Sequence, residues 1–250
     1  MSAAYDTFDY PAYWIGREYE HKSEVFALKQ FLSKIRKVKT ILDIGTGFGR
    51  LVPFYSFRAK KIILSDPSSK LLKLARETFK SKKNLKFIHS SLENLPLRVP
   101  KNSIDLIIMI RVIHHIRDIE TAFGIFGNLL KARGYLIVEF ANKRHLKATL
   151  RHFLQGDLTF PIDPTTTDIQ SRKTTVKSLP FLNYHPDKID EIMDEYGFDV
   201  VEKRSVSNIR STLLKKIFPV DFLVYVDMLT QKVLSYINFG PSIFVMARKR

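Results

Sequence analysis

Cysteine is absent from the 250-residue chain, which excludes disulfide bonds, zinc sites built from cysteine and cysteine nucleophiles. Long apolar runs are also missing. The most apolar late stretch, residues 220–237, is interrupted by Asp221, Asp227 and Lys232 and is therefore too polar to span a bilayer. The first ten residues have neither a basic start nor an apolar core, so we expect no signal peptide, no integral membrane segment and a cytoplasmic location.

Acidic residues are scarce relative to basic ones, because 41 Lys and Arg face 25 Asp and Glu and leave a formal charge of +16. The other proportions, 45% hydrophobic and 26% charged residues, are those of an ordinary globular protein and exclude a disordered or low-complexity chain. A basic surplus points to an acidic partner, such as nucleic acid, an anionic membrane or a phosphorylated substrate, but it does not indicate a fold.

Short β-branched runs alternate with helical patterns, which predicts an α/β fold with a parallel sheet. No linker rich in glycine, serine or proline divides the chain. The near-continuous Ile, Leu and Val content of the runs is typical of strands that helices cover on both faces. The seven predicted strands are residues 40–44, 61–65, 85–89, 104–110, 134–140, 198–204 and 242–247.

Capping residues mark the ends of several predicted helices. Ser68 and Asp118 precede amphipathic stretches, and we expect the second of these helices to stop at Gly134. Pro186 begins a helix that Gly197 ends. The remaining predicted segments are helical stretches at 143–155 and 211–237 and a polar loop at 157–182.

The strongest local motif places three glycines, Gly45, Gly47 and Gly49, between an apolar strand and a helical pattern, with Asp43 two residues earlier. Glycines let the backbone turn tightly and approach a ligand that a side chain would block. Backbone amides at the start of the following helix can meet an anionic group. A dinucleotide fingerprint requires glycine where this chain has Arg50, so the spacing disfavours a nicotinamide oxidoreductase.

The next predicted strand ends close to Asp66, which Pro67 follows. A carboxylate at this position is well placed to accept hydrogen bonds from a ribose diol. It could also cap the helix that begins near Ser68, and the two roles do not conflict. The glycine motif and the acid together predict a nucleotide-like cofactor that carries a ribose.

On these motifs the chain resembles class I S-adenosylmethionine-dependent methyltransferases, and most closely the methyltransferase type 11 group around the ubiquinone and menaquinone enzymes. The further motifs that carry the resemblance are residues 93–97 (ENLPL), 103–108 (SIDLII), 114–116 (HHI) and 129–136 (LLKARGYL). The resemblance implies an enzyme with S-adenosylmethionine as its cofactor. It also implies a Rossmann-like, seven-stranded, mostly parallel sheet with helices on both faces and an antiparallel last strand.

The same resemblance implies one methyltransferase domain over residues 1–250. Its expected parts are an N-terminal lid and helix (1–37), a cofactor-binding core (38–141), a substrate-side insertion (142–185) and the C-terminal part of the sheet with a helical insertion (186–250).

Site residues follow from the matched positions. The resemblance implies that Asp43, Gly45, Thr46, Gly47 and Gly49 line the methionine end of the cofactor, that Asp66 holds the ribose, that Pro67, Ser91 and Leu92 border the adenine, and that Arg111 lies under the cofactor. One position departs from the family, because Ser91 stands where these enzymes usually have an acid. A hydroxyl accepts a weaker hydrogen bond than a carboxylate, and Glu93 is the nearest substitute.

The N-terminal segment 10–20 precedes a helical pattern and has two interpretations. In similar enzymes such a segment folds over the pocket, which implies that Arg17 meets the methionine carboxylate. Alternatively, its aromatic residues only pack the helix onto the sheet. His115 is the candidate general base for acceptors that carry a proton, although a structural role is the other interpretation. The histidines show no paired metal-ligand spacing, so we expect no catalytic metal.

The acceptor is the least determined part of the prediction. A basic group at 143–152 lies beside aromatic residues in the insertion and would suit an anionic small molecule, a lipid or an RNA backbone, or would form a solvated helix face. We expect a small-molecule or lipid-like acceptor, and the basic group would suit an anionic one. A tRNA-modifying methyltransferase and a non-catalytic cofactor-binding protein of the same fold are the alternatives.

Overall fold

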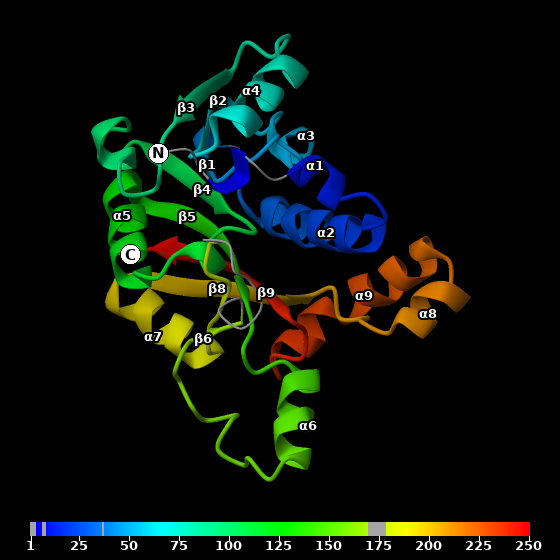
Figure 1. Cartoon of the computed structure of the whole chain (residues 1–250). Helices are drawn as coiled ribbons and strands as arrows, with labels where there is room; N and C mark the ends of the chain where they lie inside the picture. Colours follow the sequence, from blue (N-terminus) through cyan, green and yellow to red (C-terminus); the bar gives the residue numbers. More distant parts are fainter. Residues whose placement is uncertain (1–3, 7–8, 37, 170–178) are drawn as a thin grey trace.

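Seven strands form one sheet at the centre of the molecule (Figure 1). In spatial order they are β3 (Leu85–His89), β2 (Ala59–Asp66), β1 (Val38–Ile44), β4 (Ile104–Met109), β5 (Leu130–Ala141), β9 (Ser242–Lys249) and β8 (Phe198–Val206). Neighbours among β1 to β5 are parallel, whereas β9 runs antiparallel to β5 and β8. This computed structural model describes residues 4–6, 9–36, 38–169 and 179–250. The predicted Rossmann-like sheet with an antiparallel last strand is confirmed.

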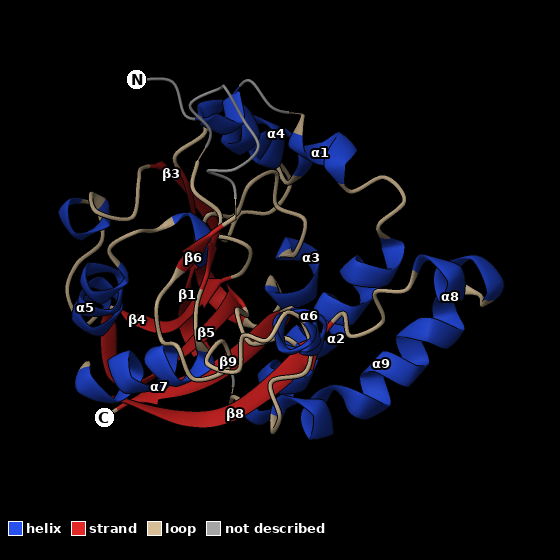
Figure 2. Cartoon of the chain, turned by 60° about the horizontal axis from the view of Figure 1, so that its bottom comes forward, coloured by secondary structure: helices blue, strands red, loops and turns tan. Residues whose placement is uncertain are grey.

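Helices cover both faces of the sheet (Figure 2). On one face lie α2 (Glu18–Lys34) and the short α3 (Val52–Tyr55), and on the other lie α5 (Ile119–Leu129) and α7 (Pro186–Glu195). The helix α4 (Ser69–Thr78) follows β2, and α9 (Val220–Ser235) packs against α2 and β8. Ser68 and Asp118 accept hydrogen bonds from the amides of Leu71 and Thr121, which confirms the two predicted caps.

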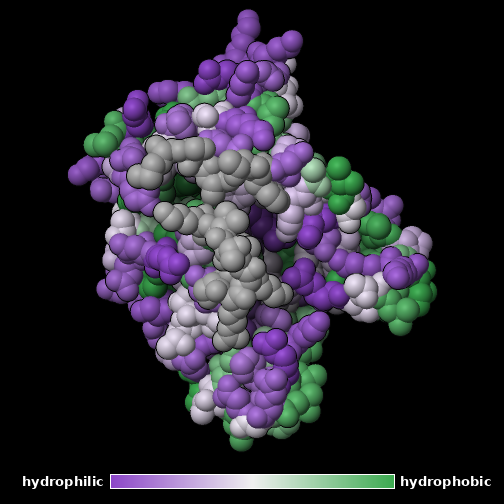
Figure 3. Space-filling model, in the orientation of Figure 1, coloured by the Kyte–Doolittle hydropathy of each residue, from purple (hydrophilic) through white to green (hydrophobic). Residues whose placement is uncertain are grey.

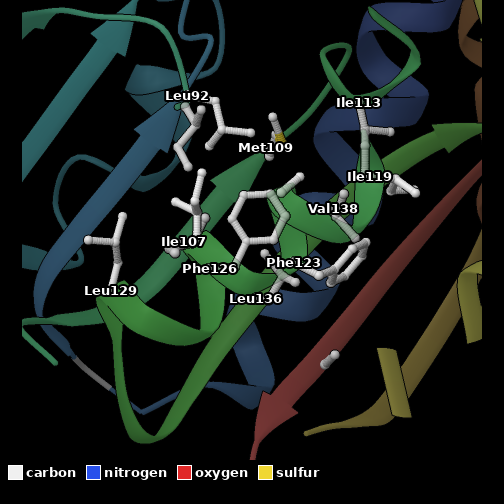
Figure 4. Packing of buried hydrophobic residues seen from close by; sticks show 14 of the residues in the cluster. Leu92, Ile107, Met109, Ile113, Ile119, Phe123, Phe126, Leu129, Leu136 and Val138 are labelled. Atoms are coloured by element: carbon white, nitrogen blue, oxygen red, sulfur yellow. The ribbon is translucent and has the colours of Figure 1, made fainter. Parts of the chain in front are cut away.

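Alternate residues of each strand serve opposite faces, which explains the near-continuous apolar runs. On β4, Leu106 belongs to the core under α2, and Ile107 to the core under α5. Figure 4 shows the second of these, where Phe123 and Phe126 of α5 lie against Leu136 and neighbouring apolar side chains of the sheet. The burial of apolar side chains on both faces stabilises the sheet. The carboxyl ends of its parallel strands then lie along one edge, where the site forms.

One predicted helix end is wrong. We expected the helix after Asp118 to stop at Gly134, but α5 ends at Leu129 and β5 begins at Leu130. Leu130 pairs with Ile104, and the register between the two strands shifts after this pair. Gly134 lies inside the irregular stretch, where a Cβ would come within 2.9 Å of the Lys131 carbonyl oxygen. The glycine permits a close backbone approach within a strand and does not end a helix.

The predicted polar loop 157–182 contains a small two-stranded sheet of β6 (Thr167–Asp168) and β7 (Leu182–Asn183). Strands of two residues are too short to leave a periodic pattern, and residues 170–178 of this loop lie outside the described residues. The predicted helix 143–155 is α6 (Leu146–Leu154), and the stretch 211–237 divides into α8 (Thr212–Ile217) and α9.

Two helices, α6 and α8, project from the body of the molecule (Figure 1). Apolar side chains gather on both projections, as Figure 3 shows in green. Exposed members include Leu150 and Phe153 on α6 and Ile217 on α8. Among the described residues, no helix is long and apolar enough to cross a membrane.

Candidate functional site

The carboxyl ends of the parallel strands β1 to β4 border a pocket of about 390 Å³. It lies where the strand order reverses between β1 and β4, the position at which open α/β sheets bind ligands. This main pocket is lined by Tyr5, Tyr10, Ile44, Gly45, Gly47, Asp66, Pro67, Leu71, Ser90, Ser91, Leu92, Glu93, Arg111, Val112, His115, Ile116 and Leu179. Its size falls within the range that small-molecule and cofactor sites occupy.

Most of the residues predicted for the site come together here. Those that line the main pocket are Gly45, Gly47, Asp66, Pro67, Ser91, Leu92, Arg111 and His115. Asp43, Thr46, Gly49 and Arg17 lie outside the lining. The first three of these support the glycine loop, as the contacts below show.

The glycine loop has the backbone that its sequence predicts. Gly45 and Gly49 have φ of 71° and 86°, in the left-handed region that favours glycine. A Cβ on Gly45 would come within 2.3 Å of Val112 Cγ2, and one on Gly49 within 2.5 Å of Phe79 Cε2. Both positions therefore require glycine for space as well as for conformation, and the loop remains open toward the main pocket.

Asp43 holds the glycine loop from beneath. It is buried, and its Oδ2 accepts hydrogen bonds from Thr46 Oγ1 at 3.0 Å and from the Tyr55 hydroxyl. Burial raises the pKa of Asp43 to about 6, against the effect of these two hydrogen bonds. Asp43 and Thr46 thus fix the loop and have no surface in the main pocket.

Asp66 ends β2 and faces the main pocket. Its Oδ2 accepts from the Gly47 amide at 2.8 Å, and its Oδ1 accepts from the Ser68 amide at 2.8 Å. Each carboxylate oxygen has a second lone pair for a ligand hydroxyl. Burial raises the pKa of Asp66 to about 6 even though the two amides favour the charged form. The carboxylate is therefore oriented by the loop and by the start of α4.

Ser91 lies at the end of the pocket beyond β3, where the family usually has an acid. Its hydroxyl accepts from Asn94 Nδ2 at 3.3 Å. Glu93 also lines the main pocket, which keeps a carboxylate within this part of the site.

A buried ion cluster joins three elements behind the pocket. Glu24 of α2 has no exposed area, and its two oxygens contact Arg50 and Arg111 at 2.5 Å each. Burial alone would raise the pKa of Glu24, but the two guanidinium groups more than reverse this and hold it below its ordinary value. Arg111, which follows β4, has a left-handed φ of 64° and donates its amide to Glu139 Oε2 at 2.9 Å.

The N-terminal segment lies over the glycine loop. The ring of Tyr10, in α1 (Tyr10–Tyr13), packs 5.9 Å from that of Phe48, and Trp14 lies under the Arg50 guanidinium at 3.6 Å. Arg17 instead stacks on Tyr13, with 4.0 Å between its Cζ and the ring centroid. The predicted contact of Arg17 with a cofactor carboxylate remains a prediction.

His115 lies in the short turn η3 (Ile113–His115) and is fixed through both ring nitrogens. Its Nδ1 is 2.7 Å from the Pro180 carbonyl oxygen, which can only accept, so Nδ1 carries the proton. Its Nε2 then accepts from the Tyr5 hydroxyl at 2.6 Å. Burial lowers the pKa of His115, which keeps the ring neutral. The sequence interpretation missed Tyr5, because no motif distinguishes it from other N-terminal aromatic residues.

A second cavity of about 180 Å³ adjoins the main pocket and shares Arg111 with it. Its lining comprises Arg111, His114, Glu139, Ala141, Asn142, His145, Ile169, Phe181, Asn183, Ser207, Arg210, Pro241 and Ser242. His114 is buried here, and its ring centroid lies 4.4 Å from that of Phe181.

Only part of the basic group 143–152 lies where an acceptor could bind. Lys143 is almost wholly buried, and its Nζ donates to Asp163 Oδ2 at 2.6 Å and to the Thr165 carbonyl oxygen at 2.8 Å. These bonds anchor the insertion, so Lys143 holds structure in place. Within this group, His145 is the residue that lines the second cavity.

We predict that Glu24→Gln lowers the free energy of unfolding by about 3–5 kcal/mol, because two guanidinium groups lose their buried counter-charge. Urea unfolding of the full chain measures this. Glu18→Gln, on the same helix but exposed, is the matched control and should leave the midpoint unchanged. Equal midpoints for the two variants would show that the cluster does not hold the site together.

Comparison with known proteins adds to this geometry. Residues 42–138 match the family model of the methyltransferase domain. No curated protein sequence matches the chain.

Solved structures share the fold. A Thermotoga maritima S-adenosylmethionine-dependent methyltransferase, described as a possible histamine N-methyltransferase, is 17% identical over 99% of both chains, with a TM-score of 0.65. Magnesium protoporphyrin IX methyltransferase from Synechocystis, with bound S-adenosylhomocysteine, is 17% identical over 92% of this chain and 84% of its own, with a TM-score of 0.57. A methyltransferase complex with the Haloferax volcanii activator Trm112 is 16% identical over 99% and 97%, with a TM-score of 0.64.

The residues present also fit the expected cofactor. The glycine loop is open to the main pocket, Asp66 has acceptor capacity for a ribose, and Leu92 and Leu71 supply apolar walls. Residues 42–138 thus match a methyltransferase domain, on the fold that S-adenosylmethionine-dependent methyltransferases share and with a pocket that suits this cofactor.

Proposed function

We propose that the enzyme methylates a small-molecule or lipid-like acceptor that enters the second cavity. The observation that carries this proposal is the position of that cavity, which shares Arg111 with the main pocket. A cavity of about 180 Å³ lies below the usual range for drug-sized ligands, so it suits a small molecule or the end of a larger one. A folded tRNA could enter this cavity only with a group of that size. We therefore propose the smaller acceptor class.

In this proposal the main pocket holds the cofactor through residues that the structure gathers there. Asp66 accepts from the ribose hydroxyls, Leu92 and Ser91 border the adenine, and Gly45 and Gly47 allow the methionine part to approach the backbone. Asp43, Thr46 and Gly49 act through the loop that they support. We further propose that the segment 10–20 serves as the cover of this pocket, as its contacts with Phe48 and Arg50 favour.

Bound S-adenosylmethionine supplies an electrophilic methyl group, so the chain has to place the acceptor and remove its proton if it carries one. His115 and Tyr5 suit the second task. The acceptor's proton would pass to the Tyr5 oxygen while the Tyr5 proton passes to His115 Nε2, which already accepts that hydrogen bond. Because burial lowers the pKa of His115, its Nε2 is unprotonated and ready at neutral pH.

The test of this function is transfer of a labelled methyl group from the cofactor into separated RNA, lipid and metabolite fractions of a cell extract. We expect label in the metabolite or lipid fraction. Label confined to RNA would contradict the proposed acceptor class and establish the tRNA-modifying alternative. Cofactor binding without label in any fraction would favour the non-catalytic alternative.

Asp66→Asn should weaken S-adenosylmethionine binding at pH 8 by about 1.5–3 kcal/mol, the usual contribution of hydrogen bonds to a charged group. The ribose hydroxyls bind the carboxylate better than the acid. With a pKa of about 6, Asp66 becomes protonated as the pH falls, so the affinity of the wild type should decrease below about pH 6 and be constant above pH 7.

Isothermal titration from pH 5 to pH 8 measures this dependence. Asp66→Asn should lose the step near pH 6. Asp43→Asn is the control, because the pKa of Asp43 is also raised to about 6 but its carboxyl lies outside the lining, so this variant should keep the step. If Asp66→Asn keeps the change in affinity near pH 6, another group must be responsible for that change.

His115→Gln and Tyr5→Phe should each lower the rate of methyl transfer by about 10²–10⁴-fold if the acceptor loses a proton, with cofactor affinity unchanged. Steady-state rates with the acceptor found above provide the measurement. His152→Gln on α6 is the matched control and should keep the wild-type rate. Rates within twofold of wild type in both site variants would restrict His115 to a structural role.

A further inference from the structure

Hydrogen-bond donors without partners gather in the second cavity. Arg210 lines it, and among the described residues its guanidinium has no hydrogen bond or ion pair. Ser207 is buried, and its hydroxyl has no partner in the described part of the chain. His145 Nδ1 accepts from the Ala148 amide, which places its proton on Nε2, for which the described residues supply no acceptor. Ser207 is buried, whereas His145 is half-buried and Arg210 is exposed. Buried polar groups in native structures are nearly always satisfied, so the unpaired Ser207 hydroxyl, beside an imidazole N–H and a guanidinium, indicates a ligand that accepts.

The charges around the cavity leave Arg210 uncompensated. Arg111 is paired with Glu24, and the second carboxylate nearby, Glu139, accepts from the Arg111 amide and from Ser242 Oγ at 2.7 Å. Partial burial and Arg111 lower the pKa of Arg210, and the Glu20 carboxylate, which forms an ion pair with Lys215 at 2.5 Å, opposes this without reversing it. A ligand that accepts at this position is therefore favoured if it is also negative.

The fold presents these donors rigidly. Asp227 of α9 has no exposed area and accepts from the Asn208 amide at 2.8 Å and from Tyr19 Oη at 3.1 Å. Tyr19 Oη in turn accepts from the Ile209 amide at 2.9 Å. Ser207 has a left-handed φ of 59°, and such strain in a non-glycine residue persists where surrounding contacts enforce it, commonly at functional sites. The loop before Arg210 is thus held in place before any ligand arrives.

We propose that the second cavity binds an anionic group of the acceptor, a carboxylate or a group of similar size such as phosphate, through Arg210, Ser207 Oγ and His145 Nε2. The inference rests on the proposed function, because it assigns the class of acceptor: a small acid whose anionic end binds beside Arg111 and whose reactive end faces the main pocket. The Phe181 ring and Ile169 provide apolar contacts for the body of such a molecule. Guanidinium groups suit this task because their planar donors match carboxylate and phosphate oxygens.

The test uses the full chain saturated with S-adenosylhomocysteine and titrated with benzoate, with its neutral analogue benzamide and with inorganic phosphate, at constant ionic strength set by NaCl. We expect benzoate or phosphate to bind and benzamide to bind at least about tenfold more weakly. Arg210→Gln should weaken anion binding by about tenfold or more, and Arg210→Lys should restore part of it. The tighter of the two anions identifies the acidic group.

Lys216→Gln is the matched control, because it removes the same charge as Arg210→Gln. Lys216 is exposed on α8 and has no ion pair in the described structure. It should bind the anions as the wild type does. Equal anion affinities for the wild type and Arg210→Gln, or equal binding of benzoate and benzamide, would overturn the inference.

A separate titration of the ligand-free chain with S-adenosylhomocysteine measures the affinity of the main pocket, which Arg210→Gln should leave unchanged because Arg210 is not part of that pocket. A wild-type chain that does not bind S-adenosylhomocysteine would overturn the proposed function. Wild-type affinity for S-adenosylhomocysteine without any selective anion binding would overturn only the acidic acceptor.

Discussion

The buried carboxylate of Glu24 is the constraint on which the site depends. A charge without exposed area is stable only with partners, and Glu24 has two, Arg50 at the end of the glycine loop and Arg111 at the end of β4. The cluster therefore fixes α2 against two separate loops of the sheet edge. It also holds Arg111 in a left-handed conformation, with its amide bound to Glu139. Through Arg111, one interaction determines where both cavities meet.

The two cavities are built differently, in accordance with the roles that we propose for them. The main pocket combines the backbone of the glycine loop and the Asp66 carboxylate with apolar walls from Leu71 and Leu92. The second cavity is formed by side chains from β5, the loop after β8 and the turn η3. Side chains differ more readily than backbone between enzymes of one fold, which suits the acceptor role that we propose for the second cavity.

Few of the surplus basic residues bear on ligand binding, although the net charge suggests an acidic partner. Lys143 belongs to the group expected to meet the acceptor, but its ammonium group donates to Asp163 and Thr165 inside the protein. Arg210, which stands alone in the sequence, lines the second cavity and forms no ion pair with any residue that the structure describes. A count of charges cannot distinguish these cases, because the difference between a structural and a binding cation lies in whether a partner is already present.

Local motifs made the cofactor side of the enzyme predictable. Strand, glycine loop and helix follow one another within a few residues, and Asp66 closes the next strand, so sequence order and spacing carry the information. The same holds for the caps at Ser68 and Asp118, which act over three residues. The end of α5 was not predictable in this way, because the competing strand pair between Leu130 and Ile104 forms between residues far apart in the chain.

By itself, the sequence therefore determined the fold class, the cofactor and the local geometry of the glycine loop. Only the tertiary structure decided which cations remain unpaired, that Tyr5 binds His115 and that Ser207 and Arg210 line a cavity with Arg111. These groups come from segments separated by 90 residues or more in the sequence and have no motif in common. Their proximity results from the burial of apolar faces on both sides of the sheet, and pairing or its absence exists only once that burial has brought them together.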